Sequence, residues 1–238
     1  MPNSPDVTAI LTAHGEGFMA GPAARSLLAA VDFAAQRGIN CEIVAVLDRA
    51  DELTNGVVRT ALGELATVIE TDEGDPGQAR NAGILASTGR FASFLDADDL
   101  WSENWVLNAY QAAQLRPEAV FHSECNIIFG EMQLVFWHID SEAADADLTY
   151  LDFNNYWDAL CFADRDIFLS HPFRRNDLAN GFGHEDWLWN AETTASGIPH
   201  KPVPETIHFK RSRRGSQMRR VNALGGVRMP VAQDSLRT

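Results

Sequence analysis

The stretch GQARNAGILASTGRFASFLDADDLW, residues 77–101, decides the fold of this chain. Its first part predicts a helix over residues 77–87, and FASFL (91–95) is a short apolar run that predicts a buried strand. The predicted strand runs directly into Asp96-Ala97-Asp98-Asp99. A helix that leads into a buried strand is typical of a repeating α/β sheet architecture.

The residues before this stretch repeat the same pattern. Apolar runs predict strands over 7–13, 41–47 and 66–70, and helical spacing predicts helices over 22–37 and 55–63. Strand, helix and strand in alternation form βαβ units, which imply a parallel sheet with helices on its faces.

The second half of the chain is less regular. A helix is expected over 103–115, and two alternating runs, 119–129 and 131–139, meet at Gly130-Glu131 and predict an antiparallel hairpin. A further helix within 181–197 is closed by Gly197, and PETIHF (204–209) is strand-like. The expected fold class is therefore α/β: a mostly parallel sheet flanked by helices, with a smaller antiparallel part in the second half.

The charge of the chain limits its partners. A net charge of −14 would repel a phosphate backbone, which argues against a nucleic-acid partner. Residues 210–220, KRSRRGSQMRR, nevertheless hold six of the 19 basic residues. This cluster suits a compact anion such as a diphosphate, and it can equally be a solvated tail or a patch that meets a membrane surface.

No apolar stretch reaches the length of a membrane span, and the first ten residues lack the order of a secretory signal. We therefore expect no transmembrane segment and a cytoplasmic location, with attachment to a membrane surface left open. A homodimer is also left open.

Polar residues follow three of the predicted parallel strands. They are Thr12 to Glu16, Asp48, and Asp96 with Asp98. Ligands of open parallel sheets bind outside the carboxyl ends of the strands, so these residues are the first candidates for a site. Two carboxylates spaced as Asp96 and Asp98 can reach one Mg²⁺ or Mn²⁺, which substrate phosphates would complete. Aspartates that simply cap turns are the alternative.

These motifs together resemble those of the inverting family 2 glycosyltransferases, which have the GT-A fold. The resemblance spans about residues 7–216 and is carried by VTAILTAHGE, EIVAVLD, the stretch 77–101 and GHEDWL. It implies a metal-dependent enzyme that moves a sugar from a nucleotide diphosphate donor, with UDP-sugars favoured, to an acceptor hydroxyl on a glycan, a lipid-linked molecule or a small molecule. The turn 47–51, LDRAD, departs from the family's usual paired aspartates.

The resemblance also implies a division of the chain. A single glycosyltransferase domain would span 1–220, with a nucleotide-binding half over about 5–100, an acceptor-binding half over about 101–209 and a basic donor loop over about 210–220. Residues 221–238 would form a C-terminal tail.

By resemblance, site roles fall on residues of both halves. The donor nucleotide would be held by Ala13, His14, Glu16, Asp48, Arg80, Asp96, Lys210, Arg211, Arg214 and Ser216. The cation would be held by Asp98, with Asp96 and His208 as further metal candidates. Asp186 matches the general base, with Glu185 beside it as a second catalytic candidate, and Asp99, Trp101 and Trp187 are candidates for contact with sugar or acceptor.

Several of these assignments have structural alternatives. Glu185 and Asp186 can instead complement the dipole at a helix N-terminus. His208 can be a solvent-facing strand residue, and both tryptophans can be core residues. At the level of function, a nucleotidyltransferase with a related sheet and a catalytically silent nucleotide- or sugar-binding module are the alternatives. The first loses support because TAHGEGFMAG has no basic residue, and the second because the acidic motifs are complete.

Overall fold

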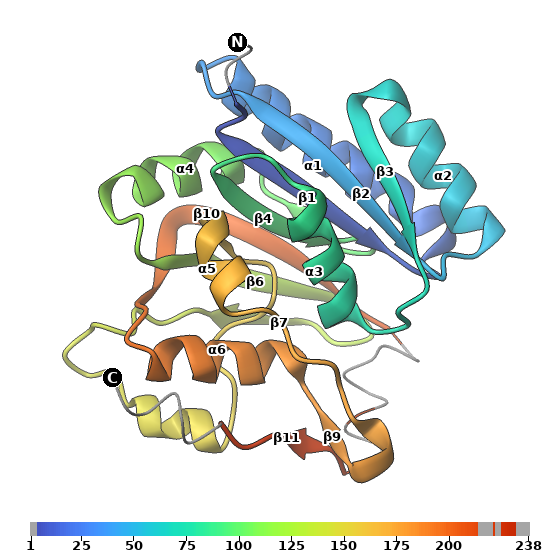
Figure 1. Ribbon diagram of the computed structural model, residues 1–238. Coiled ribbons are helices and arrows are strands. Elements are labelled where there is room, and N and C mark those ends of the chain that lie inside the picture. Colours follow the sequence, from blue (N-terminus) through green and yellow to red (C-terminus); the bar gives the residue numbers. More distant parts are fainter. Residues whose placement is uncertain (1–3, 214–220, 222–224, 232–238) are drawn as a thin grey trace.

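The computed structural model describes residues 4–213, 221 and 225–231, which fold around one central sheet (Figure 1). Within these residues the strand order is β3-β2-β1-β4-β8-β6-β10-β5, with β7 paired to β6. The strands are β1 (Val7–Ala13), β2 (Cys41–Asp48), β3 (Ala66–Thr71), β4 (Phe91–Asp96), β5 (Leu100–Trp101), β6 (Val120–Gly130), β7 (Leu134–Trp137), β8 (Phe162–Asp164) and β10 (His200–Ser212).

The first four strands in the sheet are parallel, whereas β8, β7 and β5 run antiparallel to their neighbours. β10 and β6 are parallel to each other over most of their length. The expected fold class is therefore confirmed, including the antiparallel hairpin of β6 and β7.

Helices cover both faces of the sheet. One face carries α1 (Ala20–Ala35), α2 (Glu52–Leu62) and α4 (Trp105–Leu115), and the other carries α3 (Pro76–Ala86), α5 (Arg165–Ser170) and α6 (Glu185–Ala195) (Figure 1). Alternation along β1 divides the core accordingly: Leu11 packs in the first layer and Ile10 in the second. Buried residues on both faces explain why these strands read as continuous apolar runs.

Parallel register brings the strand ends to one edge. Thr12 lies opposite Asp96 in the β1–β4 pair, and Ala13 lies opposite Leu47 in the β1–β2 pair. Asp48 and Asp96 are thus the last residues of the two strands that flank β1, and they lie at the same edge of the sheet, as the sequence predicted.

Helix α2 begins three residues earlier than the predicted range of 55–63. The side chain of Asp51 accepts a hydrogen bond from the Thr54 backbone N–H and caps the helix, which therefore starts at Glu52. The other predicted helix boundaries differ from the structure by a few residues at most.

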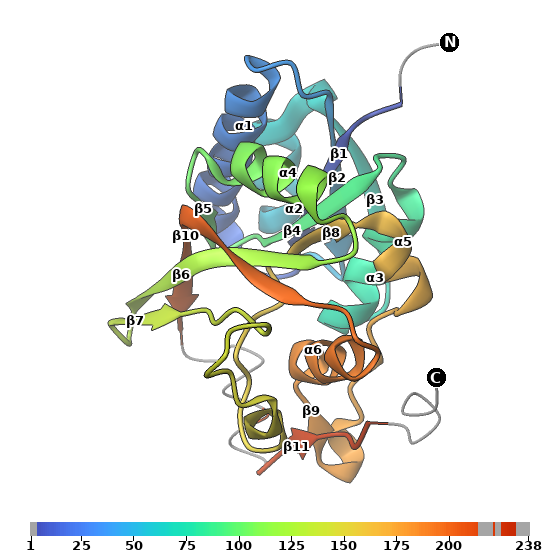
Figure 2. The same ribbon diagram turned by 90° about the vertical axis from the view of Figure 1, so that its left-hand side faces the viewer.

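The C-terminal part of the chain differs more from expectation. Lys210 and Arg211 belong to β10 rather than to a loop. A short strand, β11 (Val227–Arg228), pairs with β9 (Phe182–Gly183), so part of the expected tail belongs to the folded domain. Figure 2 shows α6, β9 and β11 together at the end of the molecule away from α1. Within the described residues, no helix has both the length and the apolar character needed to cross a membrane.

Candidate active site

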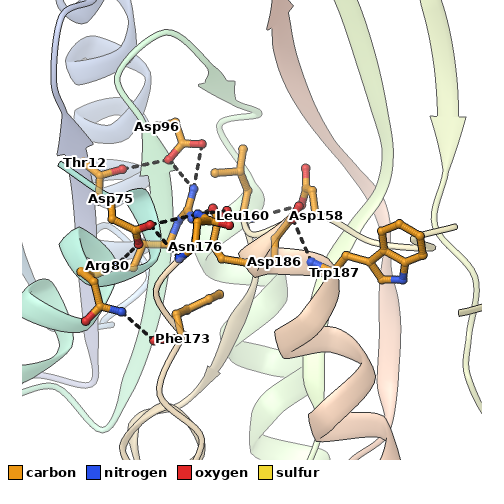
Figure 3. A network of polar contacts seen from close by, with 12 residues as sticks. Thr12, Asp75, Arg80, Asp96, Asp158, Leu160, Phe173, Asn176, Asp186 and Trp187 are labelled. Atoms are coloured by element: carbon orange, nitrogen blue, oxygen red, sulfur yellow. Dashed lines mark hydrogen bonds and ion pairs between the residues drawn. The ribbon is translucent and has the colours of Figure 1, made fainter. Parts of the chain in front are cut away.

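Asp96 ends β4 in a network of polar contacts (Figure 3). Its Oδ1 accepts a hydrogen bond from the Thr12 hydroxyl at 2.8 Å, and both of its oxygens accept from Arg80 Nη2 at 2.9 and 3.1 Å. Burial alone would raise the pKa of Asp96, but the charges of Arg80 and Lys210 outweigh burial and lower it. Asp96 is therefore an ionised carboxylate held in place by a buried cation.

Arg80 joins the two acidic motifs of the sequence. It comes from α3, and its side chain is only 4% exposed. Its Nη2 holds Asp96 (Figure 3), and its Nη1 donates to Glu185 Oε1 at 3.0 Å. The residues lie 105 and 16 positions from Arg80 along the chain. The contact fixes the start of α6 against the edge of the sheet where β4 ends.

Asn176 makes a second connection to the same helix. Its side-chain amide donates to Glu185 Oε2 at 2.9 Å and to Asp75 Oδ2 at 3.0 Å. Asp75 caps α3 through the Gln78 backbone N–H, so Asn176 ties the start of α3 to the start of α6. Both of Glu185's oxygens are thereby engaged, which suits a positioning role.

Asp186 follows Glu185 in the first turn of α6. Its Oδ1 accepts a hydrogen bond from the Trp187 backbone N–H at 2.8 Å, a local contact that also fits the helix-terminus alternative. Burial and the neighbouring Glu185 raise the pKa of Asp186 to about 7, although Arg80 and Lys210 act in the opposite direction. A carboxyl with such a pKa can accept a proton near neutral pH, as a general base must.

Asp98 and Asp99 follow β4 and pair with cations of β10 and the residue after it. Arg213 Nε donates to Asp98 Oδ2 at 2.6 Å. Lys210 Nζ lies 3.1 Å from Asp99 Oδ2 and 3.2 Å from Asp158 Oδ2, and the Arg211 backbone N–H donates to Asp99 Oδ1 at 2.7 Å.

Carboxylates outnumber cations where these contacts converge. The acids are Asp96, Asp98, Asp99, Asp158, Glu185 and Asp186, and the described cations among them are Arg80, Lys210 and Arg213. Burial and the nearby Asp98 and Asp96 raise the pKa of Asp99 to about 7 despite Lys210. Such an excess of negative charge favours an additional cation.

Residues predicted to line the nucleobase lie at the ends of β1 and β2. The His14 ring hydrogen-bonds through Nδ1 to the Asp48 backbone oxygen at 2.6 Å, and Glu16 accepts from the His14 backbone N–H at 2.6 Å. Ala13 is buried at the end of β1. Ala13, His14, Glu16 and Asp48 thus lie at one edge of the sheet, and their contact with a nucleobase stays a prediction.

The carboxylate of Asp48 is already engaged, however. It accepts hydrogen bonds from the backbone N–H groups of Glu73, Gly74 and Asp75, and from the Thr71 hydroxyl. With only 5% of the residue exposed, Asp48 organises the loop between β3 and α3. The prediction of direct base contact through its side chain is therefore not favoured by this geometry.

Three further candidates are buried. His208 is fully buried, with its ring centroid 4.5 Å from that of Trp105, so the solvent-facing alternative loses support. Neither of its ring nitrogens has a hydrogen-bond partner among the described residues, and its metal role stays a prediction. Trp101 pairs with His208 and is 3% exposed, which makes it a core residue rather than a sugar platform. Asp99 is 3% exposed and is held by Lys210.

Trp187 remains beside the site. It is half-buried, its Nε1 donates to the Leu151 oxygen at 2.7 Å, and the Arg228 guanidinium lies 5.6 Å from its ring centroid. Trp187 therefore connects the predicted base to the segment after β7 and to β11.

Arg214 and Ser216, predicted to hold the donor, lie outside the described residues. Among the residues that are described, no three or more His, Cys, Asp and Glu side chains gather as a metal cage. Asp98 offers the hard oxygen that Mg²⁺ and Mn²⁺ prefer, and the cationic Arg213 on that oxygen shows that the position suits positive charge. The site thus fits a cation that is held mainly by one carboxylate and by substrate oxygens.

Sequence reasoning missed Asn176, Asp158 and Arg213 as site residues. Arg213 belongs to the basic run that the sequence singled out, but neighbouring cations were chosen in its place. Asn176 and Asp158 stand in irregular segments, and no local pattern marks them.

Comparison with known proteins agrees with the fold. The family model for glycosyl transferase family 2 matches residues 8–174, so the chain belongs to this family. Two relatives come from Rhizobium meliloti (strain 1021). The succinoglycan biosynthesis protein ExoO is 35% identical over 97 residues, which are 40% of this chain and 26% of ExoO, and ExoW is 45% identical over 51 residues, 21% of this chain and 16% of ExoW.

Solved structures with the same fold include two of TarS from S. aureus. TarS 1-349 in complex with UDP-GlcNAc superposes with a TM-score of 0.60 at 18% identity and covers 90% of this chain and 60% of its own. The complex with UDP has a TM-score of 0.60 at 17% identity, with 92% and 64% covered. The present chain thus spans less than two thirds of each of these proteins.

Proposed function

We propose that this protein transfers a sugar from a nucleotide diphosphate donor, a UDP-sugar by preference, to an acceptor hydroxyl with inversion at the anomeric carbon. The observation that carries the proposal is Arg80, which joins Asp96 at the donor edge to the Glu185-Asp186 motif through 2.9 and 3.0 Å contacts. The preference for UDP rests on the TarS complexes with UDP-GlcNAc and UDP.

In the proposed reaction, Asp186 acts as the general base. The acceptor oxygen forms a bond to the anomeric carbon, its proton passes to the Asp186 carboxylate, and the bond to the diphosphate oxygen breaks with its electron pair. Attack on the face opposite to the leaving group inverts the configuration. The raised pKa of Asp186, about 7, suits this proton transfer at neutral pH.

The protein's other charges position the donor. Asp98 would hold a divalent cation, which when bound neutralises charge on the diphosphate leaving group. Thr12, Arg80 and Lys210 keep the carboxylates of Asp96 and Asp99 in fixed positions around the donor edge. Fixed charges of this kind need no reorganisation during the reaction, which makes them effective in catalysis.

The test pairs Asp186→Asn with Glu185→Gln in a transfer assay at saturating UDP-sugar. Asp186→Asn keeps the shape of the side chain but removes the proton acceptor, so turnover should fall by roughly 10²–10⁴ while the donor still binds. Near-normal turnover by Asp186→Asn would leave the residue with only a helix-terminal role.

A further inference from the structure

Arg213 lies between two acidic groups at the donor edge. Its Nε donates to Asp98 Oδ2 at 2.6 Å, and its Nη2 lies 3.6 Å from Glu16 Oε1. Burial raises the pKa of Glu16, and the nearby negative charge of Asp98 adds to this increase. A guanidinium placed between these carboxylates reduces their mutual repulsion.

The ion pair between Arg213 and Asp98 is more exposed to solvent than the neighbouring ion pairs. Arg80, which holds Asp96, is 4% exposed, and Lys210, which holds Asp99, is 25% exposed and contacts Asp158 as well. The Arg213 side chain is 33% exposed, whereas Asp98 is 15% exposed. A partly exposed pair gains little from its contact, so Arg213 can leave Asp98 at small cost.

A divalent cation and Arg213 would compete for one carboxylate. Both are positive, and both would bind the carboxylate of Asp98, whose Oδ2 already accepts a hydrogen bond from Arg213. A guanidinium that leaves a carboxylate needs another anionic partner, and a diphosphate can accept two of its N–H groups through a pair of phosphate oxygens.

We propose that Arg213 is a tethered counterion that Asp98 exchanges for the divalent cation, and that the released guanidinium moves to the diphosphate of the donor. The exchange rests on the proposed function, because it requires a nucleotide diphosphate at this edge. It adds Arg213 to the donor site and gives a physical reason why metal and nucleotide should bind more tightly together than separately.

The exchange couples metal and nucleotide. Without a diphosphate, the cation must displace Arg213 from Asp98, and the loss of that contact reduces the affinity for the metal by a modest factor. With a diphosphate, Arg213 gains a new partner and the cation binds more tightly. Because coupling between two ligands is reciprocal, the metal must raise nucleotide affinity by the same factor.

The experiment measures Mn²⁺ binding by calorimetry, with and without UDP, in the wild type, Arg213→Gln and Arg213→Lys. Arg213→Gln should bind Mn²⁺ alone roughly two- to fivefold more tightly, because no counterion has to leave. It should bind UDP with Mn²⁺ more weakly, so the factor by which UDP raises Mn²⁺ affinity should fall. Arg213→Lys retains the charge, so its affinities for Mn²⁺ and UDP should lie between those of the wild type and those of Arg213→Gln.

Arg116→Gln is the matched control, since Arg116 also pairs with carboxylates but stands after α4, away from this edge. It should leave both affinities unchanged. A thermal melt of each variant checks folding, and Arg213→Lys serves if Arg213→Gln does not fold.

Unchanged or weaker Mn²⁺ binding by Arg213→Gln without UDP would overturn the exchange, as would an absence of Mn²⁺ binding in every protein. Failure of the proposed function looks different: wild-type protein would then bind no UDP or UDP-sugar, with or without metal. An active wild type with no effect of Arg213→Gln on either affinity refutes the exchange alone.

Discussion

Arg80 offers a direct test of the network that holds the site together, through the substitution Arg80→Met. The variant keeps most of the side chain's volume but removes three hydrogen bonds, two to Asp96 and one to Glu185. Arg80 is 4% exposed and Glu185 9%, so Arg80→Met leaves a nearly buried carboxylate without its cation. Breaking a buried pair on one side costs roughly 3–5 kcal/mol, and the 29% exposure of Asp96 favours the lower end.

Chemical denaturation at pH 7.5 should therefore show a loss of about 3 kcal/mol, a large fraction of the stability of a typical domain. The loss should shrink on acidification. Arg80 lowers the pKa of Asp96 in the folded protein, so its contribution is present above the unfolded pKa and is lost as pH falls through the folded value.

The control is Arg59→Met, which removes an exposed pair with Glu70, where the partners are 47% and 64% exposed. Arg59→Met should change stability little. A loss below about 1 kcal/mol for Arg80→Met would refute the view that this residue carries the buried network.

Three further predictions concern metal, pH and the core. Chelation or Asp98→Ala should weaken UDP binding at least roughly tenfold by calorimetry, and equal binding in all cases would reject the metal assignment. The acid limb of kcat/KM should lie near pH 7, set by Asp186, and should move to lower pH in Glu185→Gln because a like charge is removed. Burial lowers the pKa of His200 and of His208 to about 3 from an ordinary 6.5. As the pH falls below 6.5, these histidines take up protons in the unfolded chain but not in the folded one, so the free energy of unfolding decreases. Each should cost about 2 kcal/mol at pH 5, and flat stability between pH 7 and 5 would contradict their neutral burial.

The sheet and its acidic edge could be predicted because their signals are local. FASFL followed by Asp96 is a buried strand and its end, and the parallel register then places Asp96 opposite Thr12 without further information. The cap of α2 at Asp51 was equally local and could have been found, since an aspartate three residues before Thr54 suits a helix start.

The partners of the site residues were not predictable in the same way. Arg80 meets Glu185 across 105 positions, and Asn176 meets Asp75 across 101, so only the folded chain brings them together. The burial of His208 was not predictable, because strand periodicity does not reveal that α4 covers its face with Trp105. Lys210 was placed in a loop because its charge concealed that β10 continues to Ser212.

The stereochemistry of the product tests the central proposal most directly. Purified protein, a UDP-sugar, Mn²⁺ and an accepted acceptor should yield one UDP per glycoside, and proton NMR should show an anomeric configuration opposite to that of the donor. A product that keeps the donor's configuration would contradict single displacement with Asp186 as the base.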